Sequence, residues 1–342
     1  MSEQTTGVAI VGAGGWGKNH VRNYAAMPEA ELLYVCDRSP DVRLRIEAAY
    51  PDVTVADNVR RALDDDAVEA VVIATDAPSH YAVALQALRA GKDVFVEKPM
   101  ALSSAHAREL CEVADEGERV LMVGHLLLYH PAVEELRALV VAGELGEVLY
   151  LYAQRLNLGV VRRDENAWWS LAPHDLSVAN YLFDADPEAV SATGATFLQR
   201  EQNVEDVVFA TVHYPGGRIA HVHVSWLDPH KTRNLTVVGD RKMAVFSDTS
   251  PDQKLTIFDK GVEPPAALSY EQGVRIRTGD IRIPALRMAE PLRRECEDFL
   301  RAVRTREAPR SDGRSGLEVV RALEAGTRSL RNRGVRIAVE EG

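Results

Sequence analysis

Val8–Gly17, with the sequence VAIVGAGGWG, predicts a strand, a glycine-rich turn and the start of a helix. The apolar run Val8–Val11 is typical of a strand buried on both faces of a parallel sheet. The turn fits G-x-G-x-x-G, in which the glycines allow a tight turn, a close pyrophosphate and close packing of helix on strand. Phosphates then bind free N–H groups at the start of the helix. The expected cofactor residues here are Gly12, Gly14, Gly15, Trp16 and Gly17.

Asp37 supplies the second part of this nucleotide signature. It follows a predicted strand, Glu31–Cys36, and stands 25 residues after Gly12. An acid in this place accepts both ribose hydroxyls of NAD and repels the 2′-phosphate of NADP. Because Arg38 is able to hold a 2′-phosphate, the sequence favours NAD and leaves NADP open. The alternative interpretation is that Asp37 only caps the turn that follows it.

Strands and helices alternate up to about Val123, which predicts a doubly wound parallel sheet in an α/β domain. Further strands are expected at Glu69–Thr75, Asp93–Val96 and Arg119–Gly124, and Ser79 is expected to cap a helix over Tyr81–Arg89. Ligands of such sheets bind beyond the carboxyl ends of the strands. The candidates at this edge, besides those above, are Thr75, Pro78, His80, Glu97, Lys98 and His125.

After a predicted helix at Pro131–Ala142 the pattern changes to longer strands with period-two alternation, which indicates an α+β domain on a largely antiparallel open sheet. These strands are expected at Val148–Leu156, Val190–Leu198, Val207–Tyr214, Arg218–Leu227, Asn234–Gly239 and Lys254–Asp259. Residues 251–284 resist assignment, and two amphipathic helices follow them. We therefore predict a dinucleotide domain at 1–124 and a substrate domain at 125–342, whose C-terminal helices are free to pack back on the first domain.

A connector at Gly159–Leu182 is rich in functional side chains, with two arginines, two tryptophans and a His-Asp pair. Such a composition indicates a role beyond linking two strands, and its second half predicts a helix from about Asp175. His174 is the candidate acid/base, or else a helix-capping histidine. Trp168 is either a substrate contact or a packing residue at the domain junction.

Composition excludes several classes of partner. With 40 basic and 51 acidic residues the net charge is −11, which argues against nucleic acid and anionic membranes. No apolar run is long enough to cross a bilayer, and the polar first residues are not a signal peptide. Three isolated cysteines are typical of a reduced, cytoplasmic protein. His221-x-His223 lacks a partner at ligand spacing, so no metal site is predicted; that face of the sheet is expected to meet solvent or another subunit of a homo-oligomer, a dimer or tetramer.

Gly12–Gly17, Thr75–His80 and Ala90–Pro99 (AGKDVFVEKP) resemble the Gfo/Idh/MocA family of sugar and cyclitol oxidoreductases, and the resemblance covers nearly the whole chain. It implies a Rossmann domain, with Lys98 in contact with the reacting hydroxyl and the nicotinamide and with a cis bond before Pro99. The second family motif, D-x-x-x-H, matches at His174 but has Ser170 in the place of its acid. Asp175 is a candidate for the missing carboxylate.

Val123–Ala132, Arg155–Asn157 and Arg163–Asp175 look most like family members that act on nucleotide-linked amino sugars or their uronates. Besides Lys98 and His174, the candidate substrate contacts are Tyr129, His130, Asn157, Arg163, Asn166 and Trp168. A forked guanidinium suits a carboxylate or phosphate, so Arg155, Arg162 and Arg163 are candidates for an anionic substrate group. The alternative is a solvated loop in which these arginines offset Asp164 and Glu165.

These residues suit hydride transfer between a secondary alcohol and a nicotinamide. A histidine with an ordinary pKa of about 6.5 exchanges the hydroxyl proton near neutral pH, and a lysine ammonium stabilises the developing alkoxide. The sequence therefore predicts an NAD(P)-dependent oxidoreductase that interconverts a hydroxyl and a ketone on a sugar, in particular a nucleotide-sugar. A free-sugar or cyclitol dehydrogenase is one alternative, and a catalytically silent NAD-sensing regulator is another.

Overall fold

The computed structural model describes residues 5–159, 161, 165–263 and 275–340. The chain forms two compact units, one of residues 1–129 and 289–320 and one of residues 130–288 and 321–342. The predicted ranges, 1–124 and 125–342, are contiguous, whereas these units are not. Helix α9 (Gly313–Arg331) gives its first part to one unit and the rest to the other.

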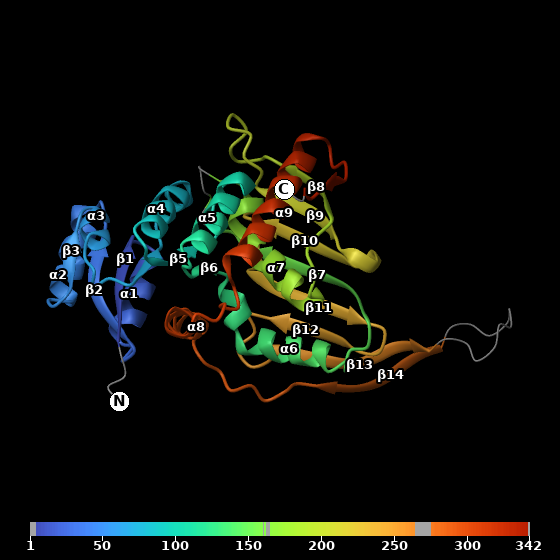
Figure 1. Cartoon of the computed structure of the whole chain (residues 1–342). Coiled ribbons are helices and arrows are strands. Elements are labelled where there is room, and N and C mark those ends of the chain that lie inside the picture. The colour runs from blue at the N-terminus through green and yellow to red at the C-terminus, as the bar shows by residue number, and fades with distance from the viewer. Residues whose placement is uncertain (1–4, 160, 162–164, 264–274, 341–342) are drawn as a thin grey trace. The chain divides into compact units, whose positions relative to one another are not determined.

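The first unit is built on a six-stranded parallel sheet of order β3-β2-β1-β4-β5-β6, so the predicted doubly wound sheet is confirmed (Figure 1). Its strands are β1 (Thr6–Val11), β2 (Ala30–Cys36), β3 (Thr54–Ala56), β4 (Ala70–Ile73), β5 (Asp93–Glu97) and β6 (Leu121–Gly124). β1 lies at the centre, paired in parallel with β2 and β4. Val8, Ala9 and Ile10 are fully buried there, as an apolar run between two helical layers requires.

The helices that connect these strands are α1 (Gly17–Ala25), α2 (Pro40–Ala49), α3 (Arg60–Leu63), α4 (Ala77–Arg89) and α5 (Ser104–Glu116). The 3₁₀ turn η1 (Leu126–Tyr129), which follows β6, and α8 (Pro291–Thr305), which follows β14, belong to the same unit. Ser103 caps α5 by accepting a hydrogen bond from the His106 N–H at 3.2 Å. The expected start of α4 is wrong: the helix begins at Ala77 with Asp76 in the N-cap position, so Ser79 lies inside its first turn. On α8 the buried residues Leu292, Cys296, Phe299, Leu300 and Val303 form the predicted apolar face.

The second unit contains a nine-stranded sheet of order β14-β13-β12-β11-β7-β10-β9-β8-β15. The strands are β7 (Val148–Leu156), β8 (Ala189–Ala195), β9 (Val207–His213), β10 (Ile219–Ser225), β11 (Thr232–Gly239), β12 (Met243–Ser247), β13 (Leu255–Glu263), β14 (Arg275–Arg282) and β15 (Ile337–Ala338). β7 and β10 pair in parallel, and the other pairs are antiparallel. The sheet is therefore mixed but mostly antiparallel, and β12, β14 and β15 are strands that the pattern did not predict.

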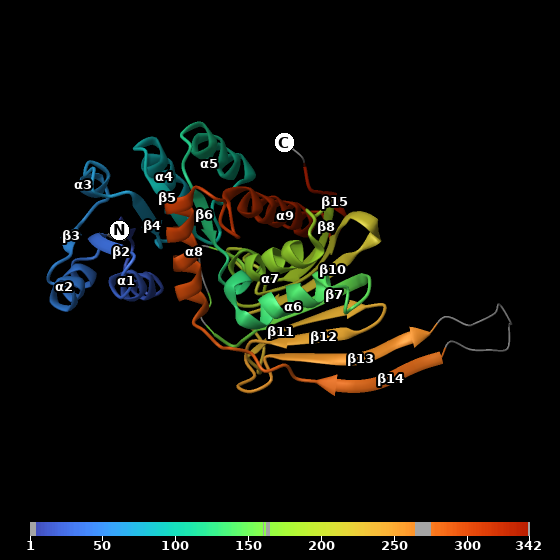
Figure 2. The ribbon, with the colours of Figure 1, turned by 60° about the horizontal axis from the view of Figure 1, so that its bottom comes forward.

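Helices α6 (Pro131–Val141) and α7 (Ala167–Phe183) cover one face of this sheet (Figure 2). Ala220, Val222 and Val224 of β10 are buried toward that face, while His221 is exposed on the other, which confirms the predicted alternation. α7 starts earlier than the expected position near Asp175, because Asn166 caps it by accepting a hydrogen bond from the Trp169 N–H at 3.0 Å. Within the described ranges no helix is both long and apolar enough to span a bilayer.

Candidate active site

The glycine turn joins β1 to α1, and two of its glycines are required by the protein itself. Gly12 has a φ of +88°, and a Cβ there would lie 2.7 Å from the Ala74 carbonyl oxygen. A Cβ on Gly17 would overlap the carbonyl oxygen of Gly12. These contacts show the close approach of helix to strand that the third glycine of the motif serves.

Gly14 and Gly15 are different, because a Cβ at either position would meet no atom within 4 Å. The packing of the protein therefore gives no reason for a glycine at these two positions. A ligand backbone that must approach the turn closely does give one, since a pyrophosphate binds against the bare main chain in this motif. The turn thus fits the dinucleotide that the sequence predicts.

Asp37 follows β2 and both of its carboxylate oxygens accept hydrogen bonds from the main chain. Oδ2 accepts from the Ala13 N–H and Oδ1 from the Ser39 N–H, each at 2.8 Å. Asp37 therefore opens the turn after β2 and also ties the glycine turn to that strand. Each oxygen keeps a lone pair for a ribose hydroxyl. Arg38 extends into solvent and lies 3.2 Å from the carboxylate of Asp76.

The segment after β4 holds three of the predicted cofactor residues. Pro78 is exposed in the first turn of α4, and the Thr75 hydroxyl accepts a hydrogen bond from Ser79 at 2.7 Å. His80 is buried, with Nδ1 2.8 Å from the Pro99 carbonyl oxygen and Nε2 3.1 Å from that of Thr75. Both ring nitrogens face protein oxygens, so a direct cofactor contact by His80 does not fit the structure.

Glu97 at the end of β5 accepts hydrogen bonds from several protein donors. Its Oε1 accepts from the Trp16 indole at 2.6 Å and lies 2.8 Å from His20 Nε2, and its Oε2 accepts from the Lys98 N–H at 3.2 Å. Burial acts to raise the pKa of Glu97, but the hydrogen bond from His20 and the nearby positive charges lower it on balance. Glu97 therefore links the glycine turn to Lys98, and its expected contact with the cofactor stays a prediction.

Lys98 is half-buried just beyond the carboxyl end of β5, and the Lys98–Pro99 peptide bond is cis, as the resemblance implied. Two further titratable groups are buried in this unit. His125 follows β6, neither of its ring nitrogens has a hydrogen-bond partner among the described residues, and burial lowers its pKa to about 4. Glu295 of α8 is fully buried, and burial together with the charge of Glu97 raises its pKa well above the ordinary value.

In the second unit His174 lies half-buried on α7, one helical turn after the buried Ser170. Asp175 does not serve as a spare carboxylate, because it forms a buried two-point ion pair with Arg155 of β7. The Nε–Oδ2 and Nη2–Oδ1 distances are 3.0 and 2.9 Å. The same pair occupies the guanidinium of Arg155, so the expected role of Arg155 toward a substrate anion does not fit. Arg162 and Arg163 lie outside the described residues.

Four other expected substrate contacts have structural partners. Trp168 is fully buried and donates its indole N–H to the Leu323 carbonyl at 3.0 Å, so it packs the second unit and presents no surface to a ligand. Asn166 caps α7 and donates to Glu205 at 2.7 Å. The buried Tyr129 donates to Asp298 at 2.8 Å, and the buried His130 caps α6. Asn157, which is exposed after β7, is the remaining described candidate from this group.

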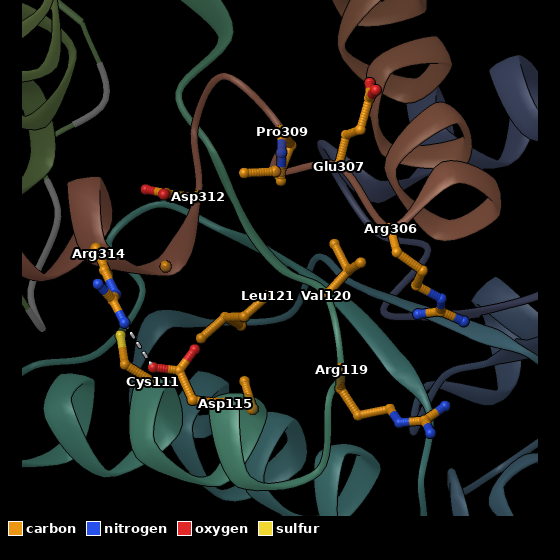
Figure 3. A pocket seen from close by; sticks show the side chains of 13 residues that line it. Cys111, Asp115, Arg119, Val120, Leu121, Arg306, Glu307, Pro309, Asp312 and Arg314 are labelled. Carbon is orange, nitrogen blue, oxygen red and sulfur yellow. Dashed lines mark hydrogen bonds and ion pairs between the residues drawn. The ribbon is translucent and has the colours of Figure 1, made fainter.

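A surface cavity of about 370 Å³ lies at the other edge of the first sheet, near the amino ends of β5 and β6 (Figure 3). Its charged groups are matched by protein partners: Arg314 pairs with Asp115 at 3.0 Å and Arg306 with Asp93 at 2.7 Å. The cavity is remote from the edge where the glycine turn and Lys98 lie, so we do not assign it to the active site. Within the described ranges no group of three or more His, Cys, Asp or Glu side chains is arranged to hold a metal ion.

Comparison with known proteins places this geometry in a family. Residues 6–125 match the model described as "Oxidoreductase family, NAD-binding Rossmann fold", and residues 133–245 match the GFO/IDH/MocA C-terminal domain. A UDP-N-acetylglucosamine 3-dehydrogenase of Acidithiobacillus ferrooxidans is 29% identical, over 94% of this chain and 96% of its own. Its crystal form P21 superposes with a TM-score of 0.81 at 26% identity, covering 96% and 98% of the two chains.

Two more relatives extend the comparison. An inositol 2-dehydrogenase of Rhizobium meliloti is 24% identical, over 95% of this chain and 97% of its own. A putative oxidoreductase from Magnetospirillum magnetotacticum has a TM-score of 0.78 at 30% identity, covering 94% and 99% of the two chains. With its glycine turn, its Glu97-Lys98-Pro99 segment and both of its domains matched, the chain belongs to the Gfo/Idh/MocA family of oxidoreductases with an NAD-binding Rossmann fold.

Proposed function

We propose that this protein is an NAD-dependent dehydrogenase that interconverts a secondary hydroxyl and a ketone on a nucleotide-sugar. One observation carries the proposal: the 2.6 Å hydrogen bond from Trp16 to Glu97 holds Lys98 beside the glycine turn, at the carboxyl edge of the sheet. Ligands of doubly wound sheets bind at this edge. A cation is thereby available where negative charge develops during oxidation of an alcohol.

The glycine turn and Asp37 would hold the dinucleotide, which when bound supplies the hydride acceptor. The ammonium of Lys98 donates a hydrogen bond to the substrate oxygen and stabilises its negative charge as the proton leaves. His174 takes that proton and returns it in the reverse direction, because a histidine exchanges protons near neutral pH. Asn157 and Arg163 are proposed to contact the substrate.

The substrate class is supported by two kinds of relative. The UDP-N-acetylglucosamine 3-dehydrogenase is similar over nearly the full length of both chains, which favours a nucleotide-linked amino sugar. The inositol 2-dehydrogenase matches equally far along the chain at lower identity, so a cyclitol is the second candidate. The proposed NAD preference rests on Asp37, while exposed Arg38 leaves a place for the 2′-phosphate of NADP.

The test is turnover of UDP-N-acetylglucosamine, its uronate, free N-acetylglucosamine and myo-inositol, each with NAD and with NADP. Lys98→Ala and His174→Ala are each expected to lower kcat roughly 10²–10⁴-fold, as for loss of a positioned acid or base. Asp37→Ser is expected to weaken NAD binding and to improve binding of NADP. Turnover of myo-inositol alone supports the cyclitol alternative, and no turnover of any of these compounds contradicts the proposal and favours a silent NAD-binding regulator.

We further propose that the protein forms a homo-oligomer through the face of the second sheet that α6 and α7 leave open. Tyr150 and Tyr152 of β7 and Phe209 of β9 are each about two-fifths exposed, and large apolar side chains gathered on one face favour association. Light scattering that gives a monomer mass would contradict this. The three cysteines are free and buried, which supports a cytoplasmic location.

A further inference from the structure

Two buried histidines contact the residues on either side of Lys98, one at a side-chain carboxylate and one at a main-chain carbonyl. His20 of α1 is completely buried, and its Nε2 lies 2.8 Å from Glu97 Oε1. His80 of α4 is 1% exposed, and its Nδ1 lies 2.8 Å from the carbonyl oxygen of Pro99. One contact therefore precedes Lys98 by one residue and the other follows it by one residue.

The contacts on Glu97 also connect this segment to the glycine turn. Its Oε1 receives the indole N–H of Trp16 in addition to His20, while its Oε2 receives the main-chain N–H of Lys98 itself. A carboxylate accepts all of these donors because it has no hydrogen of its own to place against them. Hydrogen bonds to an ionised group are stronger than neutral ones, so Glu97 fixes the first half of the segment firmly.

On the other side, His80 reaches two carbonyl oxygens, those of Pro99 and Thr75. A neutral imidazole has one N–H and therefore donates to only one of them at a time. The contact with Pro99 is the shorter, at 2.8 Å against 3.1 Å, and it is fully buried. It ties the residue after Lys98 to α4, just as His20 ties the residue before Lys98 to α1.

We propose that His20 and His80 are positioning residues, which fix the main chain on both sides of Lys98 and so aim its ammonium at the reacting oxygen. The inference rests on the proposed function, in which Lys98 donates to that oxygen. Neither histidine needs to touch substrate or cofactor for this role. Displacing a catalytic group by about 1 Å is able to lower the rate about 10²-fold, so loss of either contact should be visible in kcat.

The ring geometry allows matched variants that keep one nitrogen and remove the other. The amide nitrogen of Asn occupies the place of Nδ1, and that of Gln occupies the place of Nε2. H80N therefore keeps the donor to Pro99 and H80Q removes it, whereas H20Q keeps the donor to Glu97 and H20N removes it. The same two substitutions, to Asn and to Gln, are made at both positions. Asn is expected to preserve the contact at position 80, and Gln is expected to preserve it at position 20.

We expect H80Q and H20N to lower kcat by about 10–100-fold. The sugar KM and the NAD Kd should change less than about threefold, because neither histidine contacts the bound sugar or NAD in this proposal. H80N and H20Q should recover most of that loss. The thermal midpoint of each variant, with and without NAD, shows that it is folded. Equal kcat values for the Asn and Gln variants at both positions would overturn the proposal, because any structural role would then be indifferent to which nitrogen remains.

Lys98→Ala distinguishes this result from a failure of the proposed function. Loss of turnover in Lys98→Ala together with equal Asn and Gln variants rejects the histidine contacts and retains the catalytic lysine. Full turnover in Lys98→Ala rejects the catalytic lysine and, with it, the positioning role of both histidines. A low kcat in Lys98→Ala, together with a kcat that is higher in H80N than in H80Q and higher in H20Q than in H20N, supports both the catalytic lysine and the positioning histidines.

Discussion

Replacing His125 with Leu should make the first unit much less sensitive to acid. The imidazole of His125 is 1% exposed, and neither ring nitrogen has a hydrogen-bond partner among the described residues. Burial lowers its pKa from 6.5 to about 4, assisted by the charge of Lys98 and opposed by that of Glu97. The folded protein therefore keeps His125 neutral at a pH where the unfolded chain already protonates it.

The sign and size follow from that difference. Between about pH 6.5 and about pH 4 the unfolded state binds one more proton at this residue, so the free energy of unfolding falls as the pH falls. A difference of about 2.5 pKa units corresponds to about 3 kcal/mol at 1.36 kcal/mol per unit. Above about pH 6.5 both states are neutral and the contribution to pH dependence disappears.

The measurement is urea unfolding between about pH 7 and about pH 4, followed through hydrogen exchange of peptides from β4 and β5 so that it reports the first unit. His125→Leu should lose about 3 kcal/mol less than the parent across this range. His230→Leu, a change at an exposed loop histidine of the second unit, is the matched control and should follow the parent. The same pH slope in His125→Leu and the parent would refute the assignment of a buried neutral imidazole.

Two further predictions use contrasts within the chain. Asp175→Ala leaves the buried guanidinium of Arg155 without its partner and should cost about 3–5 kcal/mol of unfolding free energy. Asp184→Ala removes an exposed ion-pair partner and should cost at most about 1 kcal/mol. Similar losses for both variants in urea unfolding would contradict the distinction between the buried and the exposed ion pair. Gly17→Ala should destabilise the NAD-free protein, because its Cβ overlaps a main-chain oxygen. Gly14→Ala meets no protein atom, so it should change the stability of the NAD-free protein by less than about 0.5 kcal/mol and should weaken NAD binding. Calorimetry with and without NAD measures both effects, and equal NAD affinity for Gly14→Ala and the parent would remove the ligand-based reason for that glycine.

The parallel sheet was predictable because its strands carry continuous apolar runs between turn signals, as Val8–Val11 shows. β3 escaped prediction because Thr54–Ala56 is a short, half-buried edge strand with no such run. In the second sheet β14 does not follow from the pattern, because its sequence, RIRTGDIR, is too polar to show alternation. β12 is apolar and alternates in burial, but it spans only five residues. The start of α7 does not follow from the pattern although Asn166 is a good N-cap residue, because two adjacent tryptophans in a polar connector are also typical of a functional loop.

The site was predictable where a motif fixes a residue and less so where a side chain chooses among partners. Lys98 and the glycine turn follow from local spacing. Trp168 is fully buried and Tyr129 is engaged by the protein, because their polar atoms find partners far along the chain: Leu323 for Trp168 and Asp298 for Tyr129. Nothing in local spacing indicates a partner more than a hundred residues away, so the sequence alone does not separate a structural polar residue from one that contacts a ligand.

Local spacing also gives no indication of the contact that joins the two motifs of the site, the hydrogen bond from Trp16 to Glu97. The glycine turn and Glu97-Lys98-Pro99 are separate motifs in the sequence, yet one carboxylate oxygen receives both the Trp16 indole and His20. A glutamine at position 97 would place amide hydrogens against one of these donors, whereas a carboxylate accepts them all. The protein donors around Glu97 therefore explain why this position is a glutamate. Through them Lys98 is held at a fixed position relative to the glycine turn, where the dinucleotide is expected to bind.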